Sequence, residues 1–112
     1  MPADDSLEQI AERLQDKDIS ALVVLDGDRL AGIITERDIV RAVADQRDLA
    51  SCTAGEYMTQ EPATVDLETP LSKVARTMLA YGVRHLPVMV TSEVMGMVSA
   101  RDLLELESAT TT

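Results

Sequence analysis

Two aspartates, Asp38 and Asp102, share a local pattern that suits them to hydrogen-bonding chemistry. Each lies three residues after a hydroxyl residue, which is Thr35 in the first case and Ser99 in the second. A hydroxyl at the N-cap with a carboxylate in the first turn is typical of a helix start, where the acid interacts favourably with the helix dipole. A carboxylate also has two acceptor oxygens, which match the two donors of a vicinal diol. Helix capping alone and ligand binding both remain open at this point.

Basic residues are scarce, and several of them stand close to these aspartates in the sequence pattern. The chain has 10 Lys and Arg residues against 20 Asp and Glu residues, which gives a net charge of -10. Arg37 and Arg101 directly precede the two aspartates, and Arg84 stands next to the only histidine, His85. Such groups suit a phosphate. The alternative is surface salt bridging with the abundant carboxylates.

The composition argues against several other kinds of chemistry. The acidic balance and the lack of Trp and Phe disfavour nucleic acid and an anionic membrane surface as partners. A single Cys and a single His cannot form a Cys/His metal cluster, and Cys52 lies in no nucleophile motif. We therefore predict no catalytic residue and no metal. Short apolar runs and an N-terminus without a signal core lead us to expect a cytoplasmic location.

An internal repeat positions the candidate residues. Shifting the chain by 64 residues superposes residues 7–42 on residues 71–106 with seven identities and a matching apolar pattern. Each copy reads as helix–strand–strand–helix, and the second helix begins just after the hydroxyl residue. About 40 residues cannot bury a core alone. We therefore expect an α/β (α+β) fold in which the two copies pack about a pseudo-twofold axis. The predicted strands are Ala21–Leu25, Leu30–Thr35, His85–Val90 and Val94–Ser99.

The segment between the copies predicts two short elements. Thr53 and Glu56 form a possible capping box for one helical turn, and Thr64-Val65 suits a short strand. At the offset of 64, Met1 lies opposite Val65, so the first repeat is expected to lack the lead-in that precedes the second. The predicted organisation is a first repeat over residues 1–46, a connector over 47–56, a second repeat over 57–108 and a tail over 109–112.

The repeated motifs resemble those of the CBS (cystathionine β-synthase) domain family. Gly32-Ile33-Ile34-Thr35-Glu36-Arg37-Asp38 and Gly96-Met97-Val98-Ser99-Ala100-Arg101-Asp102 are similar to its glycine–hydrophobic–Thr/Ser–x–x–Asp signature. The run from Val83 to Val88 resembles its strand motif, and the run from Tyr57 to Val65 resembles its lead-in. The resemblance covers nearly the whole chain and implies a tandem CBS pair, also called a Bateman module.

The resemblance implies where a ligand would bind. In this family the aspartate accepts hydrogen bonds from ribose, the preceding Thr or Ser contacts ribose or phosphate, and each cleft combines residues of both repeats. The main site is therefore expected to use Thr35, Arg37, Asp38, Met58, Ala63, Val83, Arg84, His85 and Arg101. A weaker second site is expected to use Ile19, Ser20, Ala21, Ser99 and Asp102, because Ser20 and Ala21 stand where the main site has its basic pair.

Three functions compete at this stage. The first is a regulatory module that binds AMP, ADP, ATP or a relative such as S-adenosylmethionine. The second is a ligand-independent dimerisation or scaffold module, which would associate through apolar residues of the last helix in each repeat. The third is a fragment of an enzyme. In the first two cases a homodimer is expected. The apolar residues are Ile39, Val40, Val43, Leu103, Leu104 and Leu106.

Overall fold

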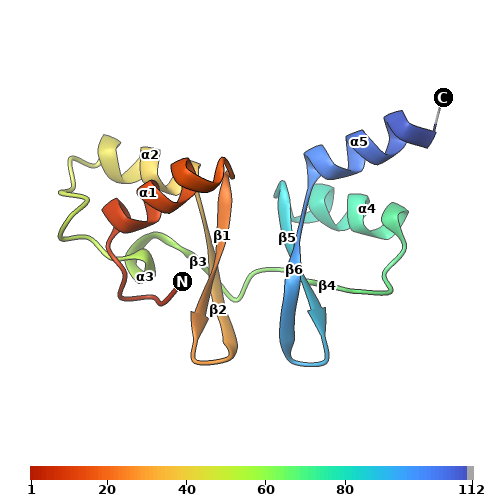
Figure 1. The fold of residues 1–112 in the computed structure, drawn as a ribbon, viewed down its shortest axis with the longest axis horizontal. Helices are drawn as coiled ribbons and strands as arrows, with labels where there is room; N and C mark the ends of the chain where they lie inside the picture. The colour runs from red at the N-terminus through yellow and green to blue at the C-terminus, as the bar shows by residue number, and fades with distance from the viewer. Residues whose placement is uncertain (111–112) are drawn as a thin grey trace. The chain divides into compact units, whose positions relative to one another are not determined.

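The computed structural model describes residues 1–110 of the chain, and the side chains of residues 1–105. The chain divides into two compact units, Met1–Glu61 and Pro62–Thr112. Each unit is built on a three-stranded sheet with helices packed beside it (Figure 1). The mixed helix-and-strand class predicted from the sequence is confirmed.

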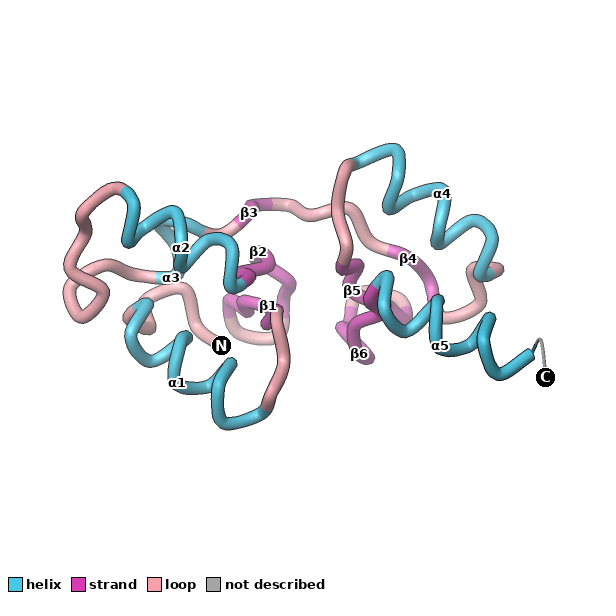
Figure 2. The backbone as a smooth tube through the Cα atoms, turned by 90° about the horizontal axis from the view of Figure 1, so that it is seen from above, coloured by secondary structure: helices cyan, strands magenta, loops and turns pink. Residues whose placement is uncertain are grey.

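The first unit is a β-hairpin extended by one short strand. β1 and β2 pair antiparallel with Ala21 opposite Thr35, and β3 pairs antiparallel with the other edge of β2. Helices α1 and α2 lie on one face of this hairpin (Figure 2). The elements are α1 (Leu7–Lys17), β1 (Ala21–Asp26), β2 (Arg29–Thr35), α2 (Glu36–Ala44), α3 (Ala54–Tyr57) and β3 (Thr59–Gln60).

The second unit repeats the hairpin but carries its short strand on the opposite edge. β5 and β6 pair antiparallel with His85 opposite Ser99, and β4 pairs parallel with β5. Helices α4 and α5 again lie on one face of the hairpin (Figure 1). The elements are β4 (Val65–Asp66), α4 (Leu71–Tyr81), β5 (His85–Val90), β6 (Glu93–Ser99) and α5 (Ala100–Thr110).

Matching helix ends support the offset of 64 residues. α1 ends at Asp18 and α4 ends at Gly82, and both cap residues adopt the left-handed conformation, with φ of 52° and 65°. Glycine adopts this conformation readily, whereas aspartate does so at a cost. The N-terminal residues also fit the offset, because Pro2 bridges Leu25 in parallel as Asp66 pairs with Met89.

The two units bury cores of different size. The first core is closed partly by the segment after α2, which contributes Cys52 and Ala54. The second core is smaller and rests on the inner faces of α4 and the sheet. The buried residues of the first core are Leu7, Ile10, Leu14, Val24, Ile34, Ala42, Cys52 and Ala54; those of the second are Val65, Val74, Met78 and Leu86.

The structure adds detail that the sequence pattern did not indicate. The predicted turn after Thr53 is α3, and the predicted short strand near Val65 is β4. The pairing of β3 with β2 was not predicted, because two polar residues carry no strand pattern. No helix within residues 1–110 is long and apolar enough to cross a membrane. The end of the predicted tail, residues 111 and 112, lies outside the described part.

Only some of the apolar helix residues proposed for dimerisation are exposed rather than packed into the core of their own unit. Val40, Val43 and Leu104 are exposed, whereas Ile39 and Leu103 pack against the cores. The side chain of Leu106 lies outside the described residues. The exposed part of this surface is therefore smaller than the sequence suggested.

The two signature glycines have different surroundings, which gives a matched pair for mutagenesis. A Cβ on Gly32 would lie 2.6 Å from the Thr59 carbonyl oxygen and 2.7 Å from the Met58 sulfur, whereas a Cβ on Gly96 would have no described atom within 4 Å. We expect Gly32→Ala to lower the free energy of unfolding by about 1–3 kcal/mol, as overpacking does.

The matched change Gly96→Ala should leave stability unchanged or raise it by up to about 1 kcal/mol, because alanine loses less backbone entropy than glycine on folding. Urea denaturation of both variants measures the two effects. Equal losses in both variants would contradict the close approach of β3 to Gly32.

Candidate functional site

A reciprocal capping box holds the helix start at Asp38. The Asp38 Oδ2 atom accepts hydrogen bonds from the Thr35 backbone N–H at 2.8 Å and from the Thr35 hydroxyl at 3.2 Å. The Asp38 N–H donates to Thr35 Oγ1 at 3.4 Å. These bonds satisfy backbone donors that a helix start leaves unpaired, and the predicted capping role is confirmed.

The second unit repeats this geometry at Asp102. The Ser99 backbone N–H donates to Asp102 Oδ2 at 2.9 Å, and the Asp102 N–H donates to Ser99 Oγ at 3.0 Å. Each carboxylate therefore uses one oxygen to cap its helix and keeps the other oxygen for a different partner. A free carboxylate oxygen at a helix start is an acceptor for a hydroxyl group.

The two carboxylates differ in what occupies that other oxygen. Asp38 is buried, with 7% of its surface exposed, and its Oδ1 atom lies 3.1 Å from Arg41 Nη2. Asp102 is exposed, and the residue equivalent to Arg41 is Glu105, which pairs instead with Arg101 at 3.4 Å. The first aspartate is thus paired with a cation, whereas the second lies one helical turn from another acid.

The start of each hairpin lies beside the helix start of the same unit. The Ser20 carbonyl accepts a hydrogen bond from the Glu36 N–H at 3.0 Å, and the Arg84 carbonyl accepts one from the Ala100 N–H at 2.8 Å. Within its own unit, the basic pair of Arg84 and His85 therefore adjoins the Asp102 helix start. Its assignment to the Asp38 site stays a prediction.

Met58 belongs to the first unit, although the sequence assigns it to the lead-in of the second repeat. Its side chain lies over Gly32 and packs against the first core. The same segment reaches Asp38 through Arg41, because the Tyr57 carbonyl accepts a hydrogen bond from Arg41 Nη2 at 3.2 Å. The lead-in of one repeat and the aspartate of the other thus lie in one compact unit.

The predicted site residues are divided between the two units, so each predicted site draws on residues of both. The structure describes every one of them. The first unit holds Ile19, Ser20, Ala21, Thr35, Arg37, Asp38 and Met58; the second holds Ala63, Val83, Arg84, His85, Ser99, Arg101 and Asp102.

The predicted phosphate-binding arginines are exposed. Arg37 and Arg84 form no ion pair with any residue in the described part of the chain. The ion pair of Arg101 with Glu105 joins two side chains that are 87% and 66% exposed, so it adds little to stability. The salt-bridge alternative therefore applies to Arg101 and not to the other two arginines.

Sequence reasoning missed a polar network around Tyr57. Arg41 and Arg47 lie over its ring, with their guanidinium carbons 5.8 Å and 5.7 Å from the ring centre. The Tyr57 hydroxyl donates to Asp45 at 2.7 Å, and that bond raises the pKa of the hydroxyl. The sequence carries a signal for one part of this network. Arg41 lies three residues after Asp38, a spacing at which side chains on a helix meet.

Glu56 links this network to the first core. Its pKa is lowered to about 2, first by the Thr53 backbone N–H at 2.8 Å and then by Arg47 at 2.9 Å and the Cys52 thiol. Burial raises the pKa of that thiol. The thiol is therefore a packed group of the first core.

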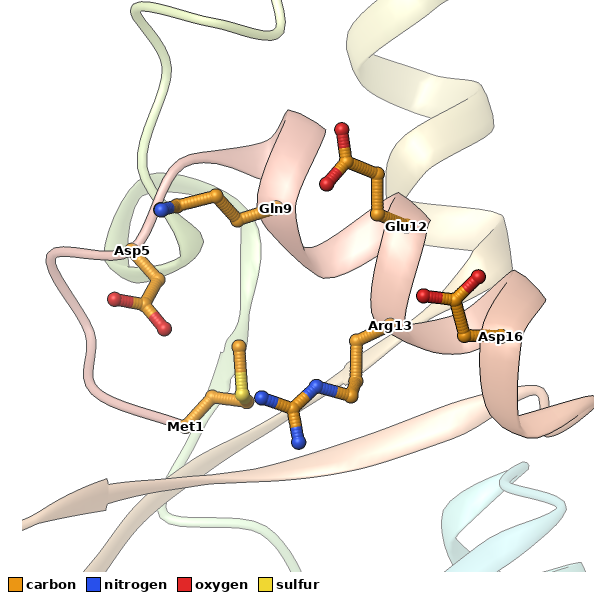
Figure 3. A pocket seen from close by; sticks show the side chains of 6 residues that line it. All are labelled: Met1, Asp5, Gln9, Glu12, Arg13 and Asp16. Atoms are coloured by element: carbon orange, nitrogen blue, oxygen red, sulfur yellow. The ribbon is translucent and has the colours of Figure 1, made fainter.

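No predicted residue lines the pocket found on the first unit. This pocket is polar and lies along α1, where Arg13 reaches toward Met1 (Figure 3). Among the described residues, no group of three or more His, Cys, Asp or Glu side chains is placed to hold a metal ion. The pocket is lined by Met1, Asp5, Gln9, Glu12, Arg13 and Asp16.

Comparison with known proteins relates the chain to a single family. The family model described as CBS domain matches residues 1–45 and 54–109. A solved protein with CBS domains from Burkholderia ambifaria is 30% identical, with a TM-score of 0.94, over 99% of this chain and 82% of that one. The chain spans between 21% and 60% of the length of three curated relatives to which it is 33–38% identical.

Two further solved structures contain adenosine compounds. A CBS domain protein from Pyrobaculum aerophilum, complexed with AMP, is 28% identical with a TM-score of 0.85, over 96% of this chain and 89% of that one. The CBS domain pair of protein MJ0100, complexed with 5′-methylthioadenosine and S-adenosyl-L-methionine, is 29% identical with a TM-score of 0.89, over 97% and 86%.

The low pKa of Glu56 predicts a pH-dependent contribution to stability. Because the folded-state pKa is about 2 and the ordinary value is 4.5, the contribution is full above pH 4.5 and is lost as the pH falls toward 2. Glu56→Gln should therefore lower the free energy of unfolding near neutral pH, and the difference from wild type should shrink below pH 4.5.

Urea denaturation across this pH range measures the effect. Glu68→Gln, at an exposed glutamate outside the network, is the control and should track wild type throughout. A Glu56→Gln difference that stays constant with pH would contradict the role given to the ionised carboxylate.

Proposed function

Because the chain belongs to the CBS domain family and carries two copies in tandem, we propose that it is a regulatory module that binds an adenosine nucleotide. Occupancy of the site would change how the repeats, or two chains, associate. CBS domain proteins are generally regulatory, and in this proposal the function lies in binding rather than in a chemical reaction. The activity of any longer protein that contains these repeats would be controlled by that event.

One observation carries this proposal. In both units a carboxylate uses one oxygen, Oδ2, to cap a helix, and its other oxygen takes no part in the cap. This arrangement recurs at the same offset in a family whose solved members include complexes with AMP and with S-adenosyl-L-methionine. A ribose presents two neighbouring hydroxyls, and a carboxylate is the side chain best able to accept from both.

We assign the main site to the Asp38 carboxylate and to residues of both repeats. Asp38 and Thr35 would bind the ribose, while the cations would bind phosphate. Apolar side chains would flank the base. The assigned residues are Thr35, Arg37 and Asp38 for the first signature, Arg84, His85 and Arg101 as donors to phosphate, and Met58, Ala63 and Val83 for the base.

The second site, at Asp102, would be weaker or would take a less charged ligand. Glu105 lies three residues beyond Asp102, at the position where the first repeat has Arg41. Its carboxylate forms an ion pair with Arg101. An additional acid beside the carboxylate disfavours a phosphate through like-charge repulsion. The remaining residues assigned to this site are Ile19, Ser20, Ala21 and Ser99.

The expected ligands share an adenosine group. AMP, ADP and ATP fit the cationic residues, and S-adenosylmethionine or methylthioadenosine suits a site with fewer of them. The relatives complexed with AMP and with methylthioadenosine and S-adenosyl-L-methionine support this class as a whole. A nucleotide panel that includes each compound would identify the ligand.

A dimerisation module without a ligand is the second candidate. It is favoured by the exposed apolar side chains Val40 and Val43 on α2 and Leu104 on α5, which are 64%, 59% and 66% exposed. A twofold homodimer, the commonest homo-oligomer, pairs the same surface patch of two chains, and an exposed apolar helix face can form such a patch. Sedimentation of the ligand-free chain, together with Val40→Lys, tests this candidate independently of nucleotide binding.

The main test is calorimetry with AMP on wild type and on Asp38→Asn. The amide retains an oxygen for the helix cap but loses the charge and one acceptor. Removing a charged hydrogen bond costs about 1.5–3 kcal/mol, so affinity should fall roughly 10- to 100-fold. The heat in wild type should saturate near one site per chain.

Asp102→Asn is the matched control and should retain most of the AMP affinity. A melting temperature that rises with AMP in wild type and not in Asp38→Asn would support the assignment by an independent readout. Equal AMP binding by wild type and Asp38→Asn would show that Asp38 is only a helix cap.

A further inference from the structure

Arg41 joins the Asp38 carboxylate to the chain segment that follows α3. Its Nη2 atom lies 3.1 Å from Asp38 Oδ1 and donates to the Tyr57 carbonyl at 3.2 Å. Its guanidinium carbon lies 5.8 Å from the centre of the Tyr57 ring. A single cation therefore contacts the carboxylate of one repeat and the lead-in of the other.

These contacts leave a single acceptor position open on the Asp38 carboxylate. Oδ2 is committed to the Thr35 cap, and Oδ1 is held by Arg41. A carboxylate oxygen accepts about two hydrogen bonds, and Oδ2 already accepts two from Thr35 while Oδ1 accepts one from Arg41. A single hydroxyl can take the remaining position on Oδ1, whereas a diol needs both positions on that oxygen and must displace the guanidinium. Arg41 has room to leave, since its side chain is 59% exposed while that of Asp38 is 9% exposed.

The second repeat lacks this competition. Its equivalent aspartate, Asp102, is exposed, and Glu105 stands where the first repeat has Arg41. The backbone N–H of the hydroxyl residue donates to the aspartate in both units, whereas the arginine and the burial of the carboxylate are found at Asp38 and not at Asp102.

From this geometry we infer that Arg41 is an intramolecular competitor for the ligand diol and sets the affinity of the Asp38 site. The inference rests on the proposed function of Asp38. When the ribose hydroxyls take Asp38 Oδ1, Arg41 leaves the carboxylate and the Tyr57 carbonyl together. Occupancy of the carboxylate is thereby coupled to the contacts of the lead-in segment.

The test compares AMP with 2′-deoxy-AMP, which lacks one hydroxyl of the diol. In wild type the second hydroxyl adds a hydrogen bond to Asp38 but breaks the ion pair of Arg41 with Asp38. The affinity that AMP gains over 2′-deoxy-AMP is therefore reduced. Arg41→Gln removes that loss, so the ratio of the 2′-deoxy-AMP and AMP dissociation constants should rise about three- to tenfold. A purely structural role of Arg41 would change both dissociation constants by the same factor.

Arg47→Gln is the matched control. Arg47 lies over the same tyrosine ring, at 5.7 Å, and pairs with Glu56 rather than with Asp38. Arg47→Gln should therefore weaken the contacts of the segment that follows α3 without changing the ratio of the two dissociation constants. If Arg41→Gln and Arg47→Gln have the same effect on the ratio, the inference is wrong.

A second readout follows the Tyr57 carbonyl directly by NMR. Saturating AMP should move its 13C chemical shift, in wild type and in Arg47→Gln, toward the value of ligand-free Arg41→Gln. A carbonyl shift that stays at its ligand-free value while AMP binds would overturn the inference and leave the proposed function intact. If neither nucleotide binds wild type, the proposed function fails and this inference fails with it.

Discussion

The capping box at the end of the central hairpin is the interaction on which the arrangement depends. A strand that turns directly into a helix leaves the first backbone N–H groups of that helix without partners inside the helix. In each unit an aspartate side chain fills this need, at 2.8 Å in the first and 2.9 Å in the second. Because the cap fixes the rotamer of the aspartate, the second carboxylate oxygen is held in one place. A structural requirement of the fold thus positions the acceptor on which the proposed function relies.

The sequence predicted those parts of the molecule that depend on local pattern. The internal repeat and its apolar pattern located both hairpins, and the hydroxyl–x–x–Asp spacing located both capping boxes. It did not predict the pairing of β3, because Thr59 and Gln60 owe their position to the edge of β2 and to the space above Gly32. The network of Tyr57 with two arginines was missed for the same reason. Such contacts join residues whose separation in the chain carries no periodic signal.

The differences between the two repeats are concentrated around the aspartates. At the offset of 64, Arg41 is replaced by Glu105 and Ser20 by Arg84, while the capping residues keep their chemistry. The shared positions are those that build the strand–helix junction. The residue three positions after the aspartate differs in charge, since it is Arg41 in the first repeat and Glu105 in the second. The duplicated framework therefore supports two local environments of different electrostatic character, one centred on a buried acid and one on an exposed acid.

The burial of Cys52 gives the first unit a built-in chemical reporter. The chain has one cysteine, and its thiol is fully enclosed by the core that α1 and α2 share. An alkylating reagent reaches such a sulfur only when the packing around it opens, so the rate of labelling reports openings of the first unit. Thiol labelling under native conditions would therefore measure how often the first unit opens. The second unit, which has no cysteine, would not contribute to the signal.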